Sequence, residues 1–225
     1  MNEITIIIPA KNEGAGIDKI INSVKVFSGD IIVVDANSGD GTREACERNG
    51  VSYLFDNGKG KGAAMAIGVL KAKFDDVVFF DADGSHDEKT IPEFIKLLKE
   101  TNVDMITVSR RLGGSREVDL SSLAGFVRSI GADFLVFLVN RRYKAKLTDV
   151  LYSFRAIRKN TFFKLELKEA GFGVEQEMVM NALQRGFKVI EIPSCERMRG
   201  WGKSKLNVLQ GIYFIWMIFV RYFKN

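Results

Sequence analysis

Short apolar runs alternate with amphipathic segments along residues 1–110. Runs rich in β-branched and aromatic residues predict β-strands at residues 4–8, 30–34, 51–55, 77–80 and 104–108. These runs are apolar on both faces, which is typical of strands that helices cover on both sides. The first part of the chain is therefore expected to form a largely parallel sheet.

Helices are predicted between these runs, at residues 16–27, 41–49, 62–73 and 91–101. At the start of the last one, Thr90 and Glu93 form a capping-box pattern and Pro92 lies in the first turn. Strand and helix thus alternate in βαβ units with right-handed crossovers. The predicted fold class is α/β, a doubly wound, mostly parallel sheet flanked by helices. Ligands of such sheets bind at the carboxyl ends of the strands.

The pattern changes after residue 115. Residues 118–139 are mostly apolar but are interrupted by Arg128 and Asp133. A strand that returns to the sheet is predicted at 150–157, a helix at 173–185 and another strand at 187–192. A basic loop at 197–205 then precedes a very apolar segment at 208–223.

Composition narrows the class of protein. The chain has 225 residues, of which 46% are hydrophobic and 27% charged, values typical of a packed globular domain. Its net charge of +5 suits a phosphate-bearing partner or an anionic membrane surface, but it is too small to indicate nucleic acid. Two cysteines and one histidine do not make a zinc site of ordinary spacing, and we expect reduced thiols in an intracellular compartment. The first residues have no signal-peptide pattern.

Polar residues follow the first two predicted strands. Pro9, Lys11 and Glu13 lie in a loop that could hold a nucleotide base through backbone groups and one carboxylate, although a plain strand-to-helix turn is an equally simple explanation. After the second strand, Asp35 stands where a carboxylate could accept hydrogen bonds from a base or ribose. Asp40 precedes Gly and Thr at a helix start, so we expect it to stabilise a turn.

A glycine-rich loop at 58–62 carries Lys59 and Lys61 just before a predicted helix. Backbone N–H groups at a helix start favour phosphate, and the lysines add positive charge. The spacing differs from that of a Walker A loop. The loop therefore indicates a phosphate contact only weakly.

Asp81 and Asp83 provide the strongest local signal. Two carboxylates, two residues apart, follow the buried strand predicted at 77–80. Such a pair can hold a small hydrated cation, Mg²⁺ or Mn²⁺, which would also bind substrate phosphate oxygens. The cation would stabilise a departing nucleoside diphosphate. We expect the nearby His86 to be a loop residue and not a metal ligand.

Basic side chains lie near two other strand ends. Arg110 follows the fifth predicted strand and could reach a phosphate with its planar guanidinium. The loop from Arg199 to Lys205 could close over a bound diphosphate and exclude water. Ordinary solvated side chains are the alternative in both places.

The apolar segment near the end has ten uninterrupted apolar residues, 211–220. A helix needs about 20 residues to cross the hydrocarbon core of a bilayer, so this segment is short for a span. Basic residues flank it: Lys203, Lys205, Arg221 and Lys224. This combination is typical of an amphipathic helix in the membrane interface, and residues 118–139 are a possible second one. A buried helix or an oligomer contact is the alternative.

These residues together resemble the family-two glycosyltransferases of the GT-A fold. Among them the chain is most similar to the polyprenyl-phosphate sugar synthases, the group that includes dolichol-phosphate mannose synthase. The resemblance covers residues 4 to about 206. It rests on the segments 8–13, 33–35, 40–42, 60–64 and 81–83, on Ser38, Ser109 and Arg110, and on Arg199, Gly202, Ser204 and Lys205.

The resemblance implies a role for each matching residue. Asp83, Arg110 and Arg199 would be catalytic, and Asp81 and Asp83 would bind the metal. Donor-binding roles would fall to Pro9, Lys11, Glu13, Val34, Asp35, Lys61, Asp81, Ala82, Ser85, Arg128 and Lys205. The sequence departs from the family at Ala36, where a second acidic residue is common, and at Ser85, where mannose synthases often have Gln.

The implied reaction is metal-dependent transfer of a hexose, with mannose or glucose favoured, from GDP-mannose or a UDP-hexose to dolichyl or polyprenyl phosphate. The resemblance implies direct displacement with inversion. Because a phosphate is already an anion at neutral pH, this acceptor needs no general base, whereas a sugar hydroxyl does. Residues 1–206 would form the GT-A domain and residues 207–225 a membrane-interface helix, at the cytoplasmic face of a membrane.

Three alternatives remain open. Transfer to a sugar hydroxyl, as in surface polysaccharide or glycolipid synthesis, would need a base such as Asp149 or Glu175. Nucleotidyl transfer is less favoured because the first loop lacks a glycine-rich, basic signature. A catalytically silent membrane adaptor is disfavoured by the intact Asp81 and Asp83.

Overall fold

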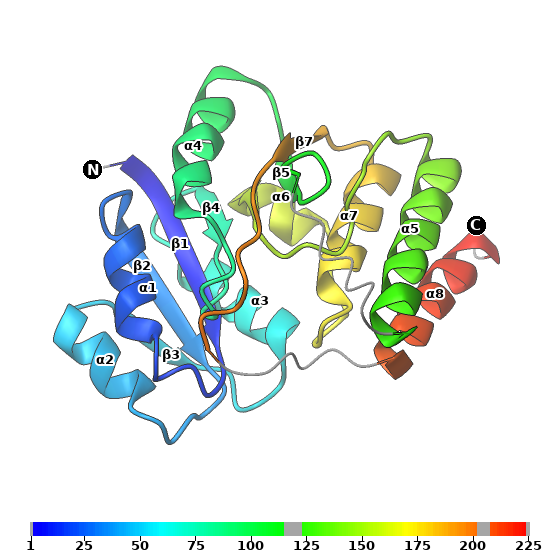
Figure 1. Ribbon diagram of the computed structural model, residues 1–225. Coiled ribbons are helices and arrows are strands. Elements are labelled where there is room, and N and C mark those ends of the chain that lie inside the picture. Colours follow the sequence, from blue (N-terminus) through cyan, green and yellow to red (C-terminus); the bar gives the residue numbers. More distant parts are fainter. Residues whose placement is uncertain (1, 115–122, 202–207, 224–225) are drawn as a thin grey trace.

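The computed structural model describes residues 2–114, 123–201 and 208–223 (Figure 1). Its centre is a seven-stranded sheet in the order β3-β2-β1-β4-β6-β5-β7. The strands are β1 (Asn2–Ala10), β2 (Ser28–Asp35), β3 (Ser52–Phe55), β4 (Asp76–Phe79), β5 (Met105–Ser109), β6 (Arg155–Arg158) and β7 (Val189–Pro193). Among these strands, β6 runs antiparallel to both of its neighbours, and the other pairings are parallel. The predicted doubly wound, mostly parallel sheet is confirmed.

The strand order reverses at β1. This strand pairs with β2 on one side and with β4 on the other, so the chain first builds the sheet outward to β3 and then returns across β1. A reversal of this kind leaves a crevice between the carboxyl ends of the two strands at which the direction changes. The predicted carboxylate pair follows β4 and therefore lies at this crevice.

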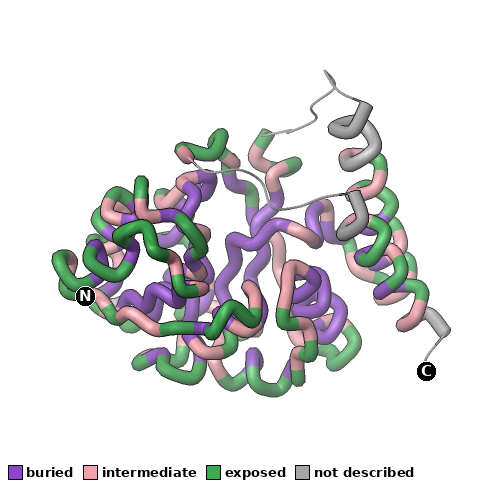
Figure 2. The backbone as a smooth tube through the Cα atoms, turned by 90° about the horizontal axis from the view of Figure 1, so that it is seen from below, coloured by how far each residue is buried: buried purple, intermediate pink, exposed green. Residues whose placement is uncertain are grey.

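Helices cover both faces of the sheet. One face carries α1 (Ile17–Val24), α2 (Thr42–Asn49) and α4 (Ile91–Glu100), and the other carries α3 (Lys61–Lys71), α5 (Leu123–Tyr143), α6 (Lys159–Lys164), α7 (Val174–Gln184) and α8 (Val208–Phe223). Side chains of each strand alternate between the two cores: Ile6 and Ile8 of β1 belong to the first, and Ile7 to the second. Figure 2 shows the buried backbone concentrated in the middle of the molecule.

The structure differs from the sequence predictions at several local points. The Thr90 hydroxyl lies 2.8 Å from the Ser194 hydroxyl and makes no cap for α4. Instead, the Asp87 carboxylate accepts a hydrogen bond from the backbone N–H of Lys89 at the start of a short 3₁₀ helix, η1 (Glu88–Thr90). The strand predicted at 150–157 is shorter and shifted, as β6, and the short helix α6 was not predicted.

The apolar C-terminal segment forms α8, which packs against α5 and the start of α7 (Figure 1). Phe214, Met217 and Ile218 belong to the buried core on that face of the sheet. The opposite side of α8 exposes Ile212 and Trp216. The segment is thus buried on one face, as the buried-helix alternative expects, and exposed on the other. Among the described residues, no helix is long and apolar enough to cross a membrane.

Truncation of a side chain should destabilise the protein strongly on the buried face of α8 and only slightly on its exposed face. Phe214→Ala should lower the free energy of unfolding by about 3–5 kcal/mol, because it removes a buried ring and leaves a cavity. Trp216→Ala should change it by about 0.5 kcal/mol or less, because that side chain is mostly exposed. Urea unfolding of both variants in the absence of lipid measures the difference. Equal losses of stability would contradict this packing of α8.

Candidate active site

Three polar loops meet at the carboxyl edge of the sheet. Ala10 at the end of β1 pairs with Asp35 at the end of β2, and Ile7 pairs with Phe79 at the end of β4. The loops after these strands, residues 11–16, 36–41 and 80–87, therefore share one edge, at the point where the strand order reverses. The structure brings most of the predicted site residues together there.

Asp35 is fully buried, and it holds two of these loops in shape. Its carboxylate accepts hydrogen bonds from the backbone N–H of Ser38 at 2.7 Å, the Ser38 hydroxyl at 2.6 Å and the Tyr53 hydroxyl at 3.0 Å. The Ser38 hydroxyl in turn accepts a hydrogen bond from Asn12 N–H at 2.6 Å. The side chain of Val34 is likewise fully buried, in the core beneath α3. We infer that Asp35 and Val34 act on a donor pocket indirectly, through the shape of these loops.

Asp40 has the turn-stabilising role expected from the sequence. Its carboxylate accepts hydrogen bonds from the backbone N–H of Gly14 at 2.7 Å and from the Thr42 hydroxyl at 2.6 Å. It therefore ties the loop after β1 to the start of α2. These bonds lower the pKa of Asp40 against the opposing effect of partial burial.

Lys61, the first residue of α3, lies between two carboxylates. Its ammonium nitrogen is 2.7 Å from Asp81 Oδ1 and 3.0 Å from Glu175 Oε1. The Ser153 hydroxyl donates a further hydrogen bond to Asp81 Oδ2 at 2.5 Å. Burial alone would raise the pKa of Asp81, but Lys61 holds it well below its usual range. Burial alone would lower the pKa of Lys61, but the two carboxylates hold it above its usual range. Lys61 and Asp81 are therefore both charged at neutral pH.

His86 is a buried support of the Asp81 loop. Its Nδ1 accepts a hydrogen bond from the backbone N–H of Asp81 at 3.0 Å, so the proton of the neutral ring is on Nε2, which faces the Ser153 hydroxyl at 3.2 Å. The ring stacks on Phe154 with 4.6 Å between centroids, and burial lowers its pKa to about 4. Both ring nitrogens are engaged, so the arrangement agrees with the expectation that His86 is not a metal ligand.

Asp83 has partners that can be exchanged more easily. Its Oδ1 accepts a hydrogen bond from the backbone N–H of Ser85 at 2.9 Å, and its Oδ2 is 2.8 Å from a guanidinium nitrogen of Arg199. Arg199 is 37% exposed in its side chain, whereas the Asp83 side chain is 7% exposed. The two aspartates of the predicted pair thus differ: Asp81 is bound to a mostly buried lysine, and Asp83 to an arginine from a surface segment.

That surface segment, residues 194–201, is here called the strap. It runs from the end of β7 across the loop after β4 (orange in Figure 1). The backbone N–H of Arg197 donates to Ser85 O at 2.8 Å, and that of Gly200 donates to Asp83 O at 2.9 Å. The Arg197 guanidinium pairs with Asp87 at 2.6 Å and with Glu88 at 2.9 Å. The part of the predicted loop that the structure describes is therefore already docked at the carboxyl edge.

Arg110 joins the loop after β5 to the strap. Its guanidinium is 2.6 Å from Asp149 and 3.3 Å from Glu196 of the strap, and it lies 4.9 Å from the centre of the Tyr152 ring. Burial would lower the pKa of Arg110, but Asp149 raises it above its usual range. Asp149 also accepts hydrogen bonds from two backbone N–H groups, those of Leu151 and Tyr152. The guanidinium of Arg110 thus lies beside the strap, and its positive charge is already paired with the carboxylates of Asp149 and Glu196.

The remaining predicted residues lie as follows. Lys11 is exposed, Pro9 is half-buried, and Glu13 is buried with its carbonyl accepting the first N–H groups of α1. Ala82 and Ser85 are buried beside the aspartates. Arg128 belongs to α5, but its side chain is outside the described part of the structure, and so is Lys205.

The structure adds residues that sequence reasoning missed. Ser153 lies 72 positions from Asp81 in the chain, and no local pattern connects the two. Glu175 was considered only as a base, whereas it is a partner of Lys61. The one usable signal was the polar run Glu175, Gln176 and Glu177 at the start of a predicted helix, directly before the apolar residues 178–180.

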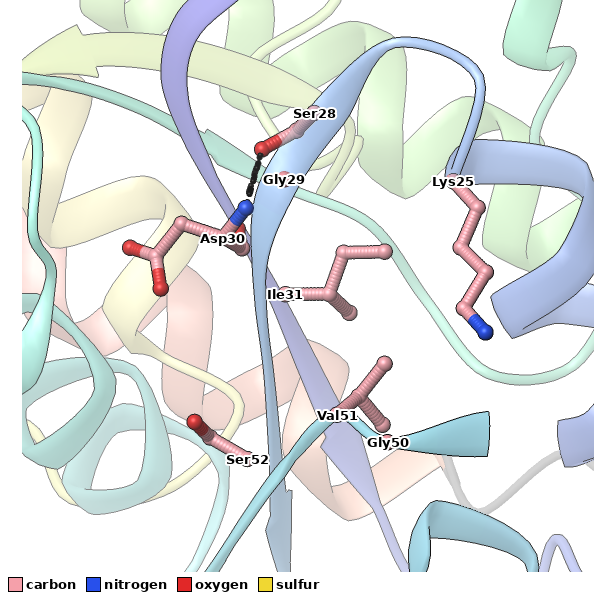
Figure 3. Close-up of a pocket in the computed structure, with 8 residues that line it drawn as sticks. All are labelled: Lys25, Ser28, Gly29, Asp30, Ile31, Gly50, Val51 and Ser52. Carbon is pink, nitrogen blue, oxygen red and sulfur yellow. Dashed lines mark hydrogen bonds between the residues drawn. The ribbon is translucent and has the colours of Figure 1, made fainter. Parts of the chain in front are cut away.

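A hollow of about 260 Å³ lies elsewhere, at the amino ends of β2 and β3 (Figure 3). Its lining includes Lys25, Ser28, Asp30 and Ser52. The Lys25 ammonium group donates to Asn49 O at 2.5 Å, and the Ser28 hydroxyl accepts from Asp30 N–H at 2.9 Å. This hollow is at the opposite edge of the sheet from the aspartates, so it is separate from the candidate site.

Comparison with known proteins relates this arrangement to glycosyltransferases. Two relatives, uncharacterized glycosyltransferases of Mycobacterium tuberculosis and Mycobacterium bovis, are each 26% identical over 208 residues, which is 91% of this chain and 89% of theirs. Among solved structures, glucosyl-3-phosphoglycerate synthase from Mycobacterium tuberculosis with Mn²⁺, UDP and phosphoglyceric acid gives a TM-score of 0.75 at 20% identity. That match covers 98% of this chain and 78% of the other. At this identity the likeness concerns the fold, which is of the GT-A type.

The family of the chain is identified by comparison with models of protein families. The model of glycosyl transferase family 2 matches residues 5–165, which is most of the chain and includes both aspartates of the candidate site. The narrower group of polyprenyl-phosphate sugar synthases stays a prediction. The chain belongs to glycosyl transferase family 2 and is an enzyme that uses a nucleotide-sugar donor.

Proposed function

We propose that this enzyme transfers a hexose, mannose or glucose, from a nucleotide-diphospho-sugar to dolichyl or polyprenyl phosphate, with inversion and release of the nucleoside diphosphate, at the cytoplasmic face of a membrane. The observation that carries the proposal is an apolar surface on the neighbouring helices α5 and α8. It consists of Ile130, Phe134, Phe137, Ile212, Trp216 and Phe219, which are all between 42% and 59% exposed. Here it is called the apolar face.

The apolar face suits a lipid surface for two reasons. Large apolar side chains gathered on a monomer surface generally mark a site for a partner or a membrane. The last turn of α5 also carries Arg142 and the exposed Arg141, whereas Arg221 of α8 is paired with Glu177 of α7. Apolar side chains beside cations fit a helix pair that lies in the interface of an anionic membrane, where a long-chain polyprenyl phosphate is dissolved.

The paired state of the two candidate bases favours a phosphate acceptor. Asp149 is bound to Arg110, and Glu175 is bound to Lys61. Each carboxylate already has a cation as its partner, so neither can take a proton from an acceptor hydroxyl without giving up that ion pair. An acceptor phosphate is anionic at neutral pH and can attack without losing a proton, so it does not need these residues as bases.

Asp83 is the residue that fits a divalent cation best. Mg²⁺ and Mn²⁺ sites commonly combine one or two carboxylates with phosphate oxygens of the substrate. Asp83 offers a carboxylate whose Oδ2 partner, Arg199, comes from the exposed strap. Asp81 has both oxygens paired, with Lys61 and Ser153, and we assign it to holding Lys61 near the donor diphosphate. The bound cation would neutralise the diphosphate as it leaves. The structurally similar synthase has been solved with Mn²⁺ or Mg²⁺ together with UDP, which supports a divalent cation beside the donor diphosphate.

A small phosphorylated acid is a second candidate acceptor. The structurally similar glucosyl-3-phosphoglycerate synthase has been solved with phosphoglyceric acid, and the match covers 98% of this chain. Arg110, between the strap and the loop after β5, could serve a small phosphate as well as a lipid phosphate. The apolar face has no role in such a reaction, which is why we favour the lipid.

The acceptor is tested with the purified full-length chain, Mg²⁺, and labelled GDP-mannose or UDP-glucose. We expect label to enter polyprenyl phosphate in detergent and to be released from the lipid by mild acid, because the sugar is then joined through a phosphate oxygen. Asp83→Asn should lose the transfer and serves as the control. Label that enters only 3-phosphoglycerate would replace the lipid with the second candidate, and label that enters neither would contradict both.

The apolar face is tested with vesicles that contain anionic phospholipid. Trp216→Glu should weaken vesicle binding about tenfold or more, because burial of a large apolar side chain is worth about 1.5–3 kcal/mol. Val26→Glu is the matched control, because Val26 is 73% exposed and lies between α1 and β2, away from α5 and α8. Co-sedimentation measures the binding. A wild-type chain that ignores vesicles, or equal losses in both variants, would contradict a membrane-binding role.

A further inference from the structure

The strap is held at its end by an inserted tryptophan. A Cβ atom added to Gly16 would lie 2.0 Å from the Trp201 ring, and one added to Gly84 would lie 3.2 Å from it. Gly16 stands just before α1, and Gly84 follows Asp83. The indole therefore fills a slot that exists because both neighbours lack a side chain. Its Nε1 is buried without a hydrogen-bond partner among the described residues, so shape and apolar contact hold it.

Two residues before this anchor, the strap reaches the proposed metal ligand. The Arg199 guanidinium is 2.8 Å from Asp83 Oδ2, and the backbone N–H of Gly200 donates to Asp83 O at 2.9 Å. The positions of the indole and the guanidinium are thus linked through a short piece of backbone that is itself bonded to Asp83. An indole that leaves the slot takes away the support of Arg199.

A guanidinium and a divalent cation compete for the same carboxylate oxygen. The Arg199–Asp83 pair is partly exposed, and pairs of this kind are weak enough to be exchanged. If the cation takes Oδ2, Arg199 is released close to the diphosphate that the cation binds. Two events that exclude each other at one oxygen must also affect each other's equilibrium by the same factor.

We propose that Trp201 is a positioning residue which, docked in the slot of Gly16 and Gly84, holds Arg199 on Asp83 until a divalent cation replaces it. Before the donor binds, the strap competes with the metal for Asp83. When the metal and the donor bind, Arg199 leaves Asp83 and pairs with the donor diphosphate. This inference rests on the proposed function in one respect, the metal at Asp83.

The first test measures Mn²⁺ affinity by calorimetry without any nucleotide. Arg199→Ala should bind Mn²⁺ about two- to fivefold more tightly than the wild type, because a weak competing ion pair is gone. Trp201→Ala should show the same gain, and Trp201→Phe a smaller one, since a phenyl ring fills part of the slot. A residue that bound only the diphosphate would not change the affinity for the metal alone.

The second test places a methyl group on Gly16, in the slot that the Trp201 indole occupies. Gly16 has φ −136°, which alanine can adopt, so Gly16→Ala should expel the indole and raise Mn²⁺ affinity like Trp201→Ala. In the Trp201→Ala background the same methyl group meets no ring, so it should have no further effect. Gly131→Ala, which adds a methyl group where no atom lies within 4 Å, is the control and should leave the affinity unchanged.

A spectroscopic signal accompanies the exchange. The chain has two tryptophans, so Trp216→Phe leaves Trp201 as the single indole emitter. Saturation with Mg²⁺ alone should shift the emission of this variant, because the loss of the Arg199–Asp83 pair weakens the docking of the indole by the same factor by which docking weakens metal binding. Added Arg199→Ala should give the shifted emission before any metal is added.

Different outcomes contradict the metal assignment at Asp83 and the exchange of Arg199 for the metal. A wild-type chain that binds no Mn²⁺, even with UDP, contradicts the metal assignment of the proposed function and the strap exchange with it. A wild type that binds Mn²⁺ while Arg199→Ala and Gly16→Ala bind it equally or more weakly overturns the strap exchange alone. An unchanged Trp201 emission at saturating Mg²⁺ also overturns it, and so does an equal gain in Gly131→Ala.

Discussion

The candidate site depends on a mostly buried cation, Lys61, held between Asp81 and Glu175. These residues belong to the start of α3, the loop after β4 and the start of α7, so a single ion cluster joins three elements that are distant in the chain. Buried charges are costly unless they are paired, and removal of one partner leaves an uncompensated charge. Glycines flank the lysine because the backbone is close: a Cβ on Gly62 would lie 2.1 Å from Glu169 O. The glycine-rich segment therefore supplies the central cation of this ion cluster and is also a candidate phosphate contact.

Because of this ion cluster, the two aspartates have different roles. Asp81 is fixed by Lys61, Ser153 and, through its backbone N–H, His86. Asp83 is left with one backbone N–H and an arginine from the strap. A site with one fixed and one exchangeable carboxylate can keep its shape while a cation and a diphosphate enter and leave. That is the requirement for an enzyme of family 2 that uses a nucleotide-sugar donor.

The sequence predicted the sheet and the location of the site because both have local signals. Apolar runs such as 77–80 mark buried strands, and polar residues such as Asp81 directly after them mark the carboxyl edge. It could not predict the partners of these residues, because Ser153 and Glu175 reach Asp81 and Lys61 only through the fold. Tyr53 likewise reaches Asp35 only through the fold, whereas Ser38 is a neighbour in the same loop. The Thr90 cap failed because its hydroxyl bonds to Ser194 of the strap, a tertiary contact that outweighs the local pattern.

We assign the maintenance of the site's structure to Asp81 and the binding of the metal to Asp83. Thermal unfolding of Asp81→Asn and Asp83→Asn, each with and without Mn²⁺, tests this assignment most directly, because a ligand that binds the folded state raises the midpoint. Asp81→Asn should unfold at a clearly lower temperature, since the mostly buried Lys61 loses one of its two charged partners at a cost on the order of 3 kcal/mol, yet should still be stabilised by Mn²⁺. Asp83→Asn should unfold near the wild-type temperature and should gain nothing from Mn²⁺. An Asp81→Asn variant of normal stability that no longer responds to Mn²⁺ would contradict this account.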